Sequence, residues 1–209
     1  MSTTLKNLYN ESKIGTLIVS YYRSGGHFLH DYLVDSITNS VALGEINELS
    51  VLTSCNIKTN YYVGILHSIH PKFYLLNDTK LLNKWHVVHL TRRDKVSHFI
   101  SNYFWKIINH KLNTNGSNFD HHATTYTNYR NYIDNQPKVV YDIEHAKVWL
   151  LEHTLSYFIK SNYQIDYSEL TSLESHEIKW NPNKYGNITL EDLFINHDEL
   201  NNLLTNFVI

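Results

Sequence analysis

The sequence predicts an α/β fold, a three-layer sandwich in which a central parallel sheet is flanked by helices. Short apolar runs rich in β-branched residues recur along the chain, and amphipathic stretches with helical spacing lie between them. No internal repeat interrupts this alternation, which is typical of strands joined by crossover helices. The 209 residues, 42% of them hydrophobic, can bury one core, so we expect a single domain over residues 1–209.

The expected elements follow this pattern in chain order. Apolar runs predict four strands, at 15–22, 61–69, 85–90 and 163–167. Amphipathic stretches predict four helices, at about 26–40, from the T-R-R-D segment to 108, at about 139–161 and from 189 to about 207. Between them, residues 110–137 are rich in Asn, Thr, Tyr and His and contain one glycine. Because periodic structure resumes on both sides, this segment is interpreted as a long polar loop or lid.

Composition excludes several classes of protein and site. Lys and Arg total 18 against 20 acidic residues, so the net charge of −2 gives no positive field for non-specific nucleic-acid binding. Cys55 is the only cysteine, which excludes an internal disulfide and a multi-cysteine zinc site. No H-E-x-x-H motif or His–carboxylate cluster accompanies the 14 histidines, so no metal site is expected. No apolar run approaches a membrane span and no signal peptide is visible, so a cytoplasmic protein is expected.

The most informative segment is Y-Y-R-S-G-G-H-F-L at 21–29, where the first strand passes through a glycine turn into a helix. This arrangement directs backbone N–H groups and a helix N-terminus at an anion. Gly25 and Gly26 allow close approach of the backbone, Ser24 adds a hydroxyl and Arg23 adds a charge. The segment is neither a Walker A sequence nor G-x-G-x-x-G, which disfavours ordinary ATP hydrolysis and a dinucleotide site. A plain strand-to-helix turn remains the alternative.

A second segment, H-L-T-R-R-D-K-V-S-H-F-I-S at 89–101, leads from the third strand into a helix. Arg93 stands at the strand end and Ser101 two turns into the helix, so a guanidinium and a hydroxyl could hold a phosphate. Together the two segments resemble motifs of the PAPS-dependent sulfotransferases, Y-P-[KR]-S-G-T-T-x-L and R-[DN]-x-x-x-x-x-x-S. A third match is Q-I-D-Y-S-E-L at 164–170, which is similar to the family's V-x-Y-E-D-L. T-R-R-D-K-V at 91–96 resembles the bacterial carbohydrate branch, which includes trehalose sulfotransferase.

The resemblance implies a P-loop-type fold, with PAPS (3′-phosphoadenosine-5′-phosphosulfate) as sulfuryl donor and PAP as product. Arg93 and Ser101 are implied to hold the 3′-phosphate and Tyr167 to lie near the adenine. The 5′-phosphosulfate is implied to lie against the loop residues Arg23, Ser24, Gly25, Gly26, His27 and Phe28, with Arg23 stabilising the leaving group. The sequence departs from the family at Tyr22, which replaces a proline, and at Gly26 and His27, which replace two threonines.

The catalytic base has several candidates. In the carbohydrate branch a glutamate shortly after the first helix serves, and Glu45 stands at the matching place. In the cytosolic branch a histidine at the end of the second strand serves, which corresponds to His67. Glu45 is preferred, and His27, His70 and Glu48 remain open. The lid at 110–137 is expected to choose the acceptor, with a stacking wall for sugars drawn from Tyr103, Trp105, Tyr126, Tyr129 and Tyr132.

The sequence thus predicts a sulfotransferase that acts on a hydroxyl of a carbohydrate or small-metabolite acceptor. A peptide sulfotransferase is a competitor within the same class, disfavoured by the absence of a visible signal or anchor. A catalytically silent nucleotide-binding or interaction module is the alternative from another class, because the G-G-H of the loop departs from the family. A nucleotide-dependent kinase of related fold is disfavoured by the missing Walker lysine. No nucleic-acid or membrane partner is expected, and a homodimer is left open.

Overall fold

The computed structural model describes residues 13–46, 49–55, 60–67, 83–114, 130–131, 133–170 and 187–207, with the backbone alone described at 49, 53 and 107–114. The chain divides into two compact units. Unit 1 comprises Met1–Arg93 and Leu155–His176, and unit 2 comprises Asp94–Thr154 and Glu177–Ile209. The prediction that residues 1–209 form one sulfotransferase-like domain stays a prediction.

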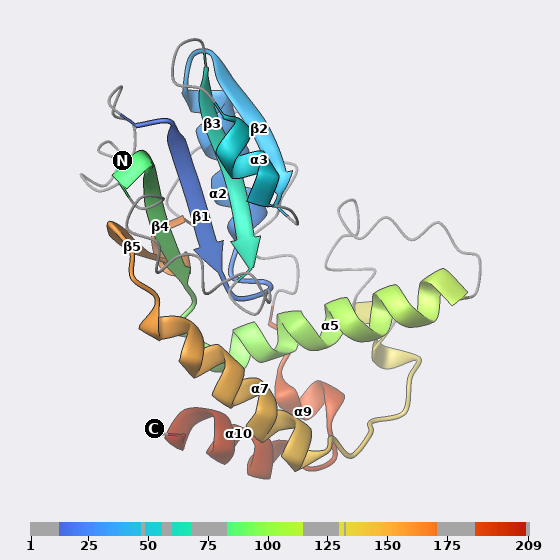
Figure 1. Ribbon diagram of the computed structural model, residues 1–209. Helices are drawn as coiled ribbons and strands as arrows, with labels where there is room; N and C mark the ends of the chain where they lie inside the picture. Colours follow the sequence, from blue (N-terminus) through green and yellow to red (C-terminus); the bar gives the residue numbers. More distant parts are fainter. Residues whose placement is uncertain are drawn as a thin grey trace. The chain divides into compact units, whose positions relative to one another are not determined.

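Unit 1 holds a five-stranded, all-parallel sheet in the order β2-β3-β1-β4-β5 (Figure 1). Its strands are β1 (Gly15–Ser20), β2 (Ser40–Glu45), β3 (Tyr61–His67), β4 (Trp85–Thr91) and β5 (Tyr163–Asp166). Its helices are α2 (Gly26–Ser36), α3 (Leu49–Ser54), the 3-10 turn η2 (Ser156–Phe158) and α8 (Tyr167–Leu170). The predicted α/β fold with a central parallel sheet flanked by helices is therefore confirmed.

Burial across the sheet explains its strand sequences. Every residue of β1 and of β4 is buried, as expected for central parallel strands covered on both faces. Ile18 of β1 stands in register with Ile65 of β3 and with Val88 of β4, and all three side chains are inaccessible to solvent. The edge strand β2 is half-buried or exposed along its whole length. The continuous apolar runs in the sequence thus correspond to the centre of the sheet.

The two faces of the sheet are covered by different helices. Leu17 and Val19 of β1 belong to an apolar cluster that includes Leu52 of α3. Ser20 points to the opposite face, because successive strand residues alternate. There a Cβ added to Gly26, the first residue of α2, would lie 3.0 Å from the Ser20 hydroxyl. Helices α3 and α2 therefore lie on opposite faces of the sheet (Figure 1).

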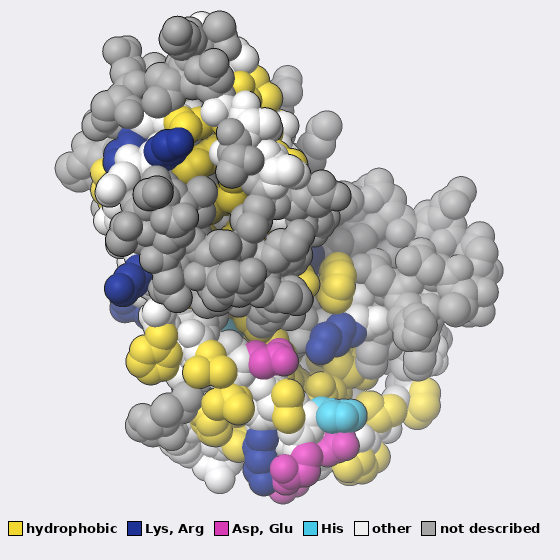
Figure 2. Space-filling model, in the orientation of Figure 1, with side chains coloured by type: hydrophobic (Ala, Val, Ile, Leu, Met, Phe, Trp, Pro, Cys, Tyr) yellow, Lys and Arg dark blue, Asp and Glu magenta, His cyan; other side chains and the backbone are white. Residues whose placement is uncertain are grey.

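Unit 2 is helical and has an aromatic core. It contains α5 (Lys95–Thr114), α9 (Leu190–Leu193) and α10 (His197–Asn206), together with α7 (Ile143–Leu155), which ends at the boundary between the units. The Phe99 ring lies 5.2 Å from that of Trp149 and 6.2 Å from that of Phe194, centroid to centroid. Apolar side chains also reach the surface over α7, including Val148 and Leu151 (Figure 2). No helix in the described ranges is long and apolar enough to cross a membrane.

Several predicted boundaries are wrong by part of a turn or more. The first helix ends at Ser36 rather than at 40, where Ile37 adopts an extended conformation. Helix α5 runs to Thr114 and so takes up the first five residues of the predicted lid. Residues 130–131 and 133–134 are helical too, whereas 115–129 and 132 lie outside the described residues. The predicted final helix is two helices, α9 and α10, because the chain is extended at Phe194.

Strand β2 was not predicted from the sequence. Its segment S-V-A-L-G-E is short, contains a glycine and lies at the sheet edge, so it lacks the continuous apolar run of the central strands. Its pairing with β3 is irregular between Ala42 and Gly44, and Gly44 has a φ of 63°. This strand matters for function because its last residue is Glu45.

Candidate functional site

At the carboxyl ends of β1 and β4, neighbouring connections leave the sheet in opposite directions. The connection from β1 leads to β2 on one side of the sheet, whereas the chain after β4 continues to β5 on the other side. In open parallel sheets, ligands bind where neighbouring connections diverge in this way. The segments that leave at this point are the loop from Tyr21 to Gly25 and the residues Arg92 and Arg93. These are the segments that carry the two principal sequence motifs.

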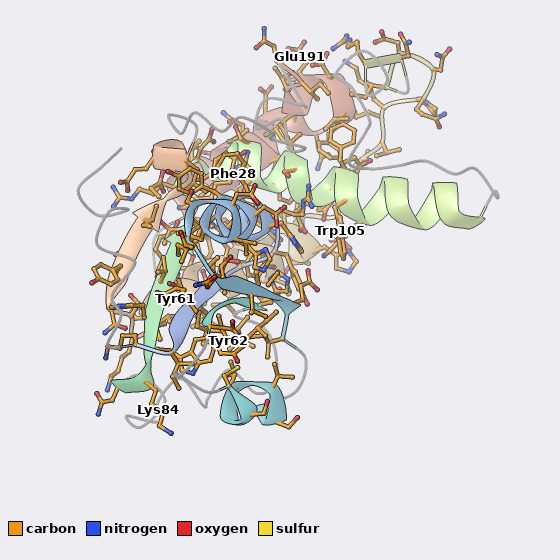
Figure 3. The ribbon with its side chains drawn as sticks, turned by 90° about the horizontal axis from the view of Figure 1, so that it is seen from above. Phe28, Tyr61, Tyr62, Lys84, Trp105 and Glu191 are labelled. Carbon is orange, nitrogen blue, oxygen red and sulfur yellow. The ribbon has the colours of Figure 1, made fainter. Side chains whose placement is uncertain are left out.

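The loop after β1 has the backbone of an anion-binding turn. Arg23 has a φ of 65° and Gly25 a φ of 91°, both in the left-handed region. Gly25 is the N-cap of α2, and the first turn of this 11-residue helix contains no acidic residue. The first N–H groups of a helix have no partner within it and carry a partial positive charge. The backbone therefore suits a phosphate at Gly26, His27 and Phe28. The Phe28 side chain lies on α2 (Figure 3) and is buried.

The loop is packed against the ends of β4 and β5. The Arg92 guanidinium donates through Nη1 to the carbonyl oxygen of Arg23 at 3.2 Å. Its Cζ lies 4.4 Å from the centroid of the Tyr167 ring, a cation–π contact. The same ring touches Gly25, since a Cβ added there would lie 2.6 Å from a ring carbon. Tyr167, predicted to lie near the adenine, is thus placed directly beside the loop from Tyr21 to Gly25, which is named the phosphate loop after its predicted ligand.

Arg93 differs from its neighbour Arg92 in exposure. Its side chain is 75% exposed, and its Nε lies 3.9 Å from Oδ2 of Asp166. The backbone N–H of Arg93 donates to the same oxygen at 3.0 Å. Burial raises the pKa of Asp166, but hydrogen bonds from Ser168, the Arg93 backbone and Thr91 outweigh it and leave the pKa below its ordinary value. Asp166 is therefore a stable anion that anchors the backbone at Arg93 while the guanidinium stays open to solvent.

Three candidate bases lie together beside the loop. His27, in the first turn of α2, places its Nε2 at 2.8 Å from Oε1 of Glu45 at the end of β2. His67, at the end of β3, places its Nε2 at 3.1 Å from the same oxygen. The His67 ring is also 4.2 Å from the ring of Tyr22, centroid to centroid. These residues lie up to 40 positions apart along the chain, and the sheet brings them into one hydrogen-bonded cluster, His27–Glu45–His67.

The cluster holds groups that can accept a proton at neutral pH. Burial raises the pKa of Glu45, yet the hydrogen bonds and charges of His67 and His27 outweigh it, so the pKa lies below its ordinary value. Burial lowers the pKa of His67, and the hydrogen bond to Glu45 opposes this only in part. Both shifts favour an ionised carboxylate beside a neutral His67 imidazole. Among the described residues, no group of His, Cys, Asp and Glu is arranged to hold a metal ion.

The structure leaves some predicted site residues apart or undescribed. Ser101 lies in α5 of unit 2 and its side chain is 2% exposed, whereas Arg93 ends unit 1, so their shared phosphate stays a prediction. A hollow of about 330 Å³ among α5, α9 and α10 is lined by none of the predicted site residues. Five further candidates lie outside the described residues, together with most of the lid: His70, Glu48, Tyr126, Tyr129 and Tyr132.

Sequence reasoning missed Arg92. The sequence motifs assign it no role, but its side chain is buried against the loop. No local signal distinguishes it from Arg93, because both arginines follow the apolar run of the same central strand and only the fold buries one of them. Comparisons of the chain with family models, curated proteins and solved structures found no match.

Proposed function

We propose that the chain is a PAPS-dependent sulfotransferase that acts on a hydroxyl of a carbohydrate or small-metabolite acceptor. The observation that carries the proposal is the cluster His27–Glu45–His67 beside the phosphate loop, which joins a proton acceptor to an anion site. A simple strand-to-helix turn needs neither feature. The sequence motifs supply the choice of donor, because they resemble those of sulfotransferases and lack the Walker lysine.

The described residues fit the donor in several respects. The left-handed backbone at Arg23 and Gly25 opens the loop, and the first turn of α2 offers N–H groups to a 5′-phosphosulfate. Gly25 has no room for a Cβ, because the Tyr167 ring fills that space. The exposed guanidinium of Arg93 is open to a 3′-phosphate. These residues would therefore hold both anionic ends of PAPS in unit 1, with Ser101 as the predicted further ligand.

The chemistry divides between the donor and this chain. When bound, PAPS supplies the sulfuryl group, which bonds to the acceptor oxygen as its bond to the phosphate oxygen breaks and PAP leaves. Glu45 takes the proton of the acceptor hydroxyl, and His27 and His67 hold the carboxylate in place. Arg23 and the first-turn amides of α2 balance the negative charge that develops on the leaving phosphate. No step needs a metal ion, since positioning and charge balance carry the transfer.

The test is thermal unfolding of the full chain with PAP, ADP and ATP over a range of concentrations. A ligand at 100 times its Kd adds about 2.7 kcal/mol to stability, which gives a clear rise in Tm. We expect PAP to stabilise the chain more than ADP, and Arg93→Ala and Ser101→Ala each to remove that difference. A charge-matched control is Lys84→Ala, at the amino end of β4 and away from Phe28 in α2 (Figure 3).

Two outcomes would overturn the proposal. Equal rises in Tm with PAP and with ADP would support only a loop that binds phosphate in general. No rise in Tm with either ligand would support a plain strand-to-helix turn. If PAP binds, incubation with labelled PAPS and a panel of carbohydrate hydroxyl acceptors tests turnover through the release of PAP. Tight PAP binding with no turnover, unchanged by Glu45→Gln, would favour the catalytically silent nucleotide-binding module instead.

A further inference from the structure

Arg92 is buried at the point where three parts of the site meet. Its side chain is 9% exposed, although it carries a charge. Its Nη1 donates to the Arg23 carbonyl at 3.2 Å, and its guanidinium stacks on the Tyr167 ring at 4.4 Å. Its own carbonyl oxygen accepts a hydrogen bond from the Tyr157 hydroxyl at 3.3 Å. A buried guanidinium is costly unless its surroundings compensate, so this placement calls for a role.

The Arg92 contact fixes one peptide plane of the loop. The carbonyl of Arg23 and the N–H of Ser24 belong to the same planar peptide group. Arg92 holds the carbonyl end, and the Ser24 N–H donates to the carbonyl of Tyr21 at 3.3 Å. The plane is thus held at both ends, although Arg23 has a φ of 65°, which a residue with a Cβ adopts only at a cost in energy. Holding this plane sets the direction of the N–H groups that follow it.

Tyr167 supports the same arrangement from β5. Its ring lies against Gly25, where a Cβ would approach ring carbons at 2.6 and 2.7 Å, and it stacks on the Arg92 guanidinium. Asp166 fixes the start of α8 through hydrogen bonds from the N–H and hydroxyl of Ser168, at 3.1 and 2.7 Å. Loop, guanidinium and ring are therefore packed as one piece, built from the carboxyl ends of three strands.

We infer that Arg92 is a positioning residue of the phosphate loop: it holds the Arg23 carbonyl so that the loop presents its N–H groups to the 5′-phosphate. The inference rests on the proposed function, because it needs an anion at the loop. It assigns the two adjacent arginines different tasks. Arg92 acts through the loop on any ligand with a 5′-phosphate, whereas Arg93, which is exposed, acts on the 3′-phosphate alone.

The experiment measures the Kd of PAP and of ADP by titration calorimetry for wild type, Arg92→Met, Arg92→Lys, Arg93→Ala and Lys84→Ala. Losing a hydrogen bond from a charged group costs enough to weaken binding about tenfold or more. We expect Arg92→Met to weaken PAP and ADP by the same factor, leaving their ratio unchanged. Arg93→Ala should weaken PAP alone, and Lys84→Ala should weaken neither.

Arg92→Lys distinguishes the positioning role of Arg92 from the effect of its charge. It also replaces Arg92→Met in the experiment if that variant does not fold. A lysine keeps the charge but lacks the planar fork that stacks on the ring and donates to the carbonyl together. We expect it to lose affinity for both ligands, and full affinity would overturn the positioning role. A lower Tm without ligand, with both Kd values unchanged, would also overturn it, because that pattern marks a purely structural residue. Absent binding of PAP and ADP by wild type would instead overturn the proposed function and this inference with it.

Discussion

At the scale of single residues, the unusual feature is one carboxylate oxygen that two imidazoles share. Oε1 of Glu45 lies 2.8 Å from Nε2 of His27 and 3.1 Å from Nε2 of His67. The Glu45 side chain is 44% exposed and that of His67 only 13%. An acceptor hydroxyl arriving from solvent can therefore reach the carboxylate more readily than the imidazole of His67. This difference in access favours Glu45 as the base and His67 as the residue that positions it.

The pH dependence of kcat/KM distinguishes these two roles. A base must be deprotonated, so the rate falls as the pH drops through its pKa. The pKa of Glu45 lies below 4.5, because its hydrogen bonds to the histidines outweigh its burial. We therefore expect kcat/KM to stay constant as the pH falls from 7 to about 5 and to decline only below 4.5. The pKa of His67 lies below the ordinary histidine value of 6.5 because the side chain is buried. An acid limb in kcat/KM that begins between pH 6.5 and about 5 would therefore contradict this expectation and assign His67 as the base.

Substitution of the two residues gives an independent measure. Glu45→Gln keeps the size of the side chain and removes its basicity, so kcat should fall by about 10²–10⁴-fold while the affinity for PAP persists. His67→Asn should reduce kcat less, because it removes one of two hydrogen bonds to Glu45. Single-turnover rates measured with saturating PAPS check both expectations. A larger loss in His67→Asn than in Glu45→Gln would reverse the assignment.

At the scale of elements, the turn between β1 and α2 combines strain with close packing. Gly25 has a φ of 91° and would bring a Cβ within 2.6 Å of the Tyr167 ring. Gly25→Ala therefore adds a steric clash to the cost of a left-handed alanine, which is about 1–2 kcal/mol. We expect a loss of stability greater than this cost, together with weaker PAP binding, measured by urea unfolding and calorimetry.

Gly44 provides the matched control for this turn. It has a φ of 63°, but no atom lies within 4 Å of where its Cβ would be. Gly44→Ala should thus cost only the conformational term of about 1–2 kcal/mol and leave PAP binding unaffected. Because Gly44 directly precedes the candidate base Glu45, only stability and PAP binding, and not turnover, are compared between the two variants. Equal losses of stability in the two variants would show that the Tyr167 ring moves aside and is not a fixed support.

The same scale shows what the sequence could predict. The central strands β1, β3 and β4 were predicted from apolar runs, because both faces of a parallel sheet are buried at its centre. Strand β2 was not predicted, since an edge strand needs no such run. The other edge strand, β5, was predicted although only Ile165 in it is buried. The turn from β1 into α2 was predicted from the glycines between a strand and a helix, and the binding of an anion there stays a prediction. Arg92 could not be told from Arg93, because burial of one of two adjacent arginines depends on strand register, which no local pattern records.

The candidate base was predicted only in part for a related reason. Glu45, His67 and His27 were each proposed from position, but their mutual contact depends on the order of three strands. Strand order is a property of the whole sheet and has no signature within any one segment. The sequence therefore proposed these residues as alternatives, whereas in the fold both histidines are hydrogen-bonded to Glu45, and the identity of the base stays a prediction.

At the scale of the whole molecule, the resolved pKa shifts of histidines and carboxylates all link stability to pH in one direction. Burial lowers the pKa of His89 from 6.5 to about 4, and burial also lowers those of His67 and His86. These histidines bind protons more readily in the unfolded chain, so stability falls as the pH drops below 6.5. Carboxylates with lowered pKa values extend the loss further into acid, and they are Glu45, Asp166 and Asp192.

His89 should account for much of this acid sensitivity. Its side chain is 1% exposed in the central strand β4, and its ring lies 5.9 Å from that of Tyr157. A pKa that is 6.5 in the unfolded chain and about 4 in the fold corresponds to about 3 kcal/mol of stability, present above pH 6.5 and lost on acidification to pH 4. His89→Gln carries no titrating group, so its free energy of unfolding should fall less between pH 7 and pH 4.5. Urea unfolding followed by circular dichroism at the two pH values measures this difference.

His145→Gln, at a side chain that is 77% exposed, is the matched control, and its free energy of unfolding should change between the two pH values as much as that of the wild type. If the free energy of unfolding changes equally with pH in His89→Gln and in the wild type, protonation of His89 does not destabilise the fold. The acid sensitivity then belongs to the other groups.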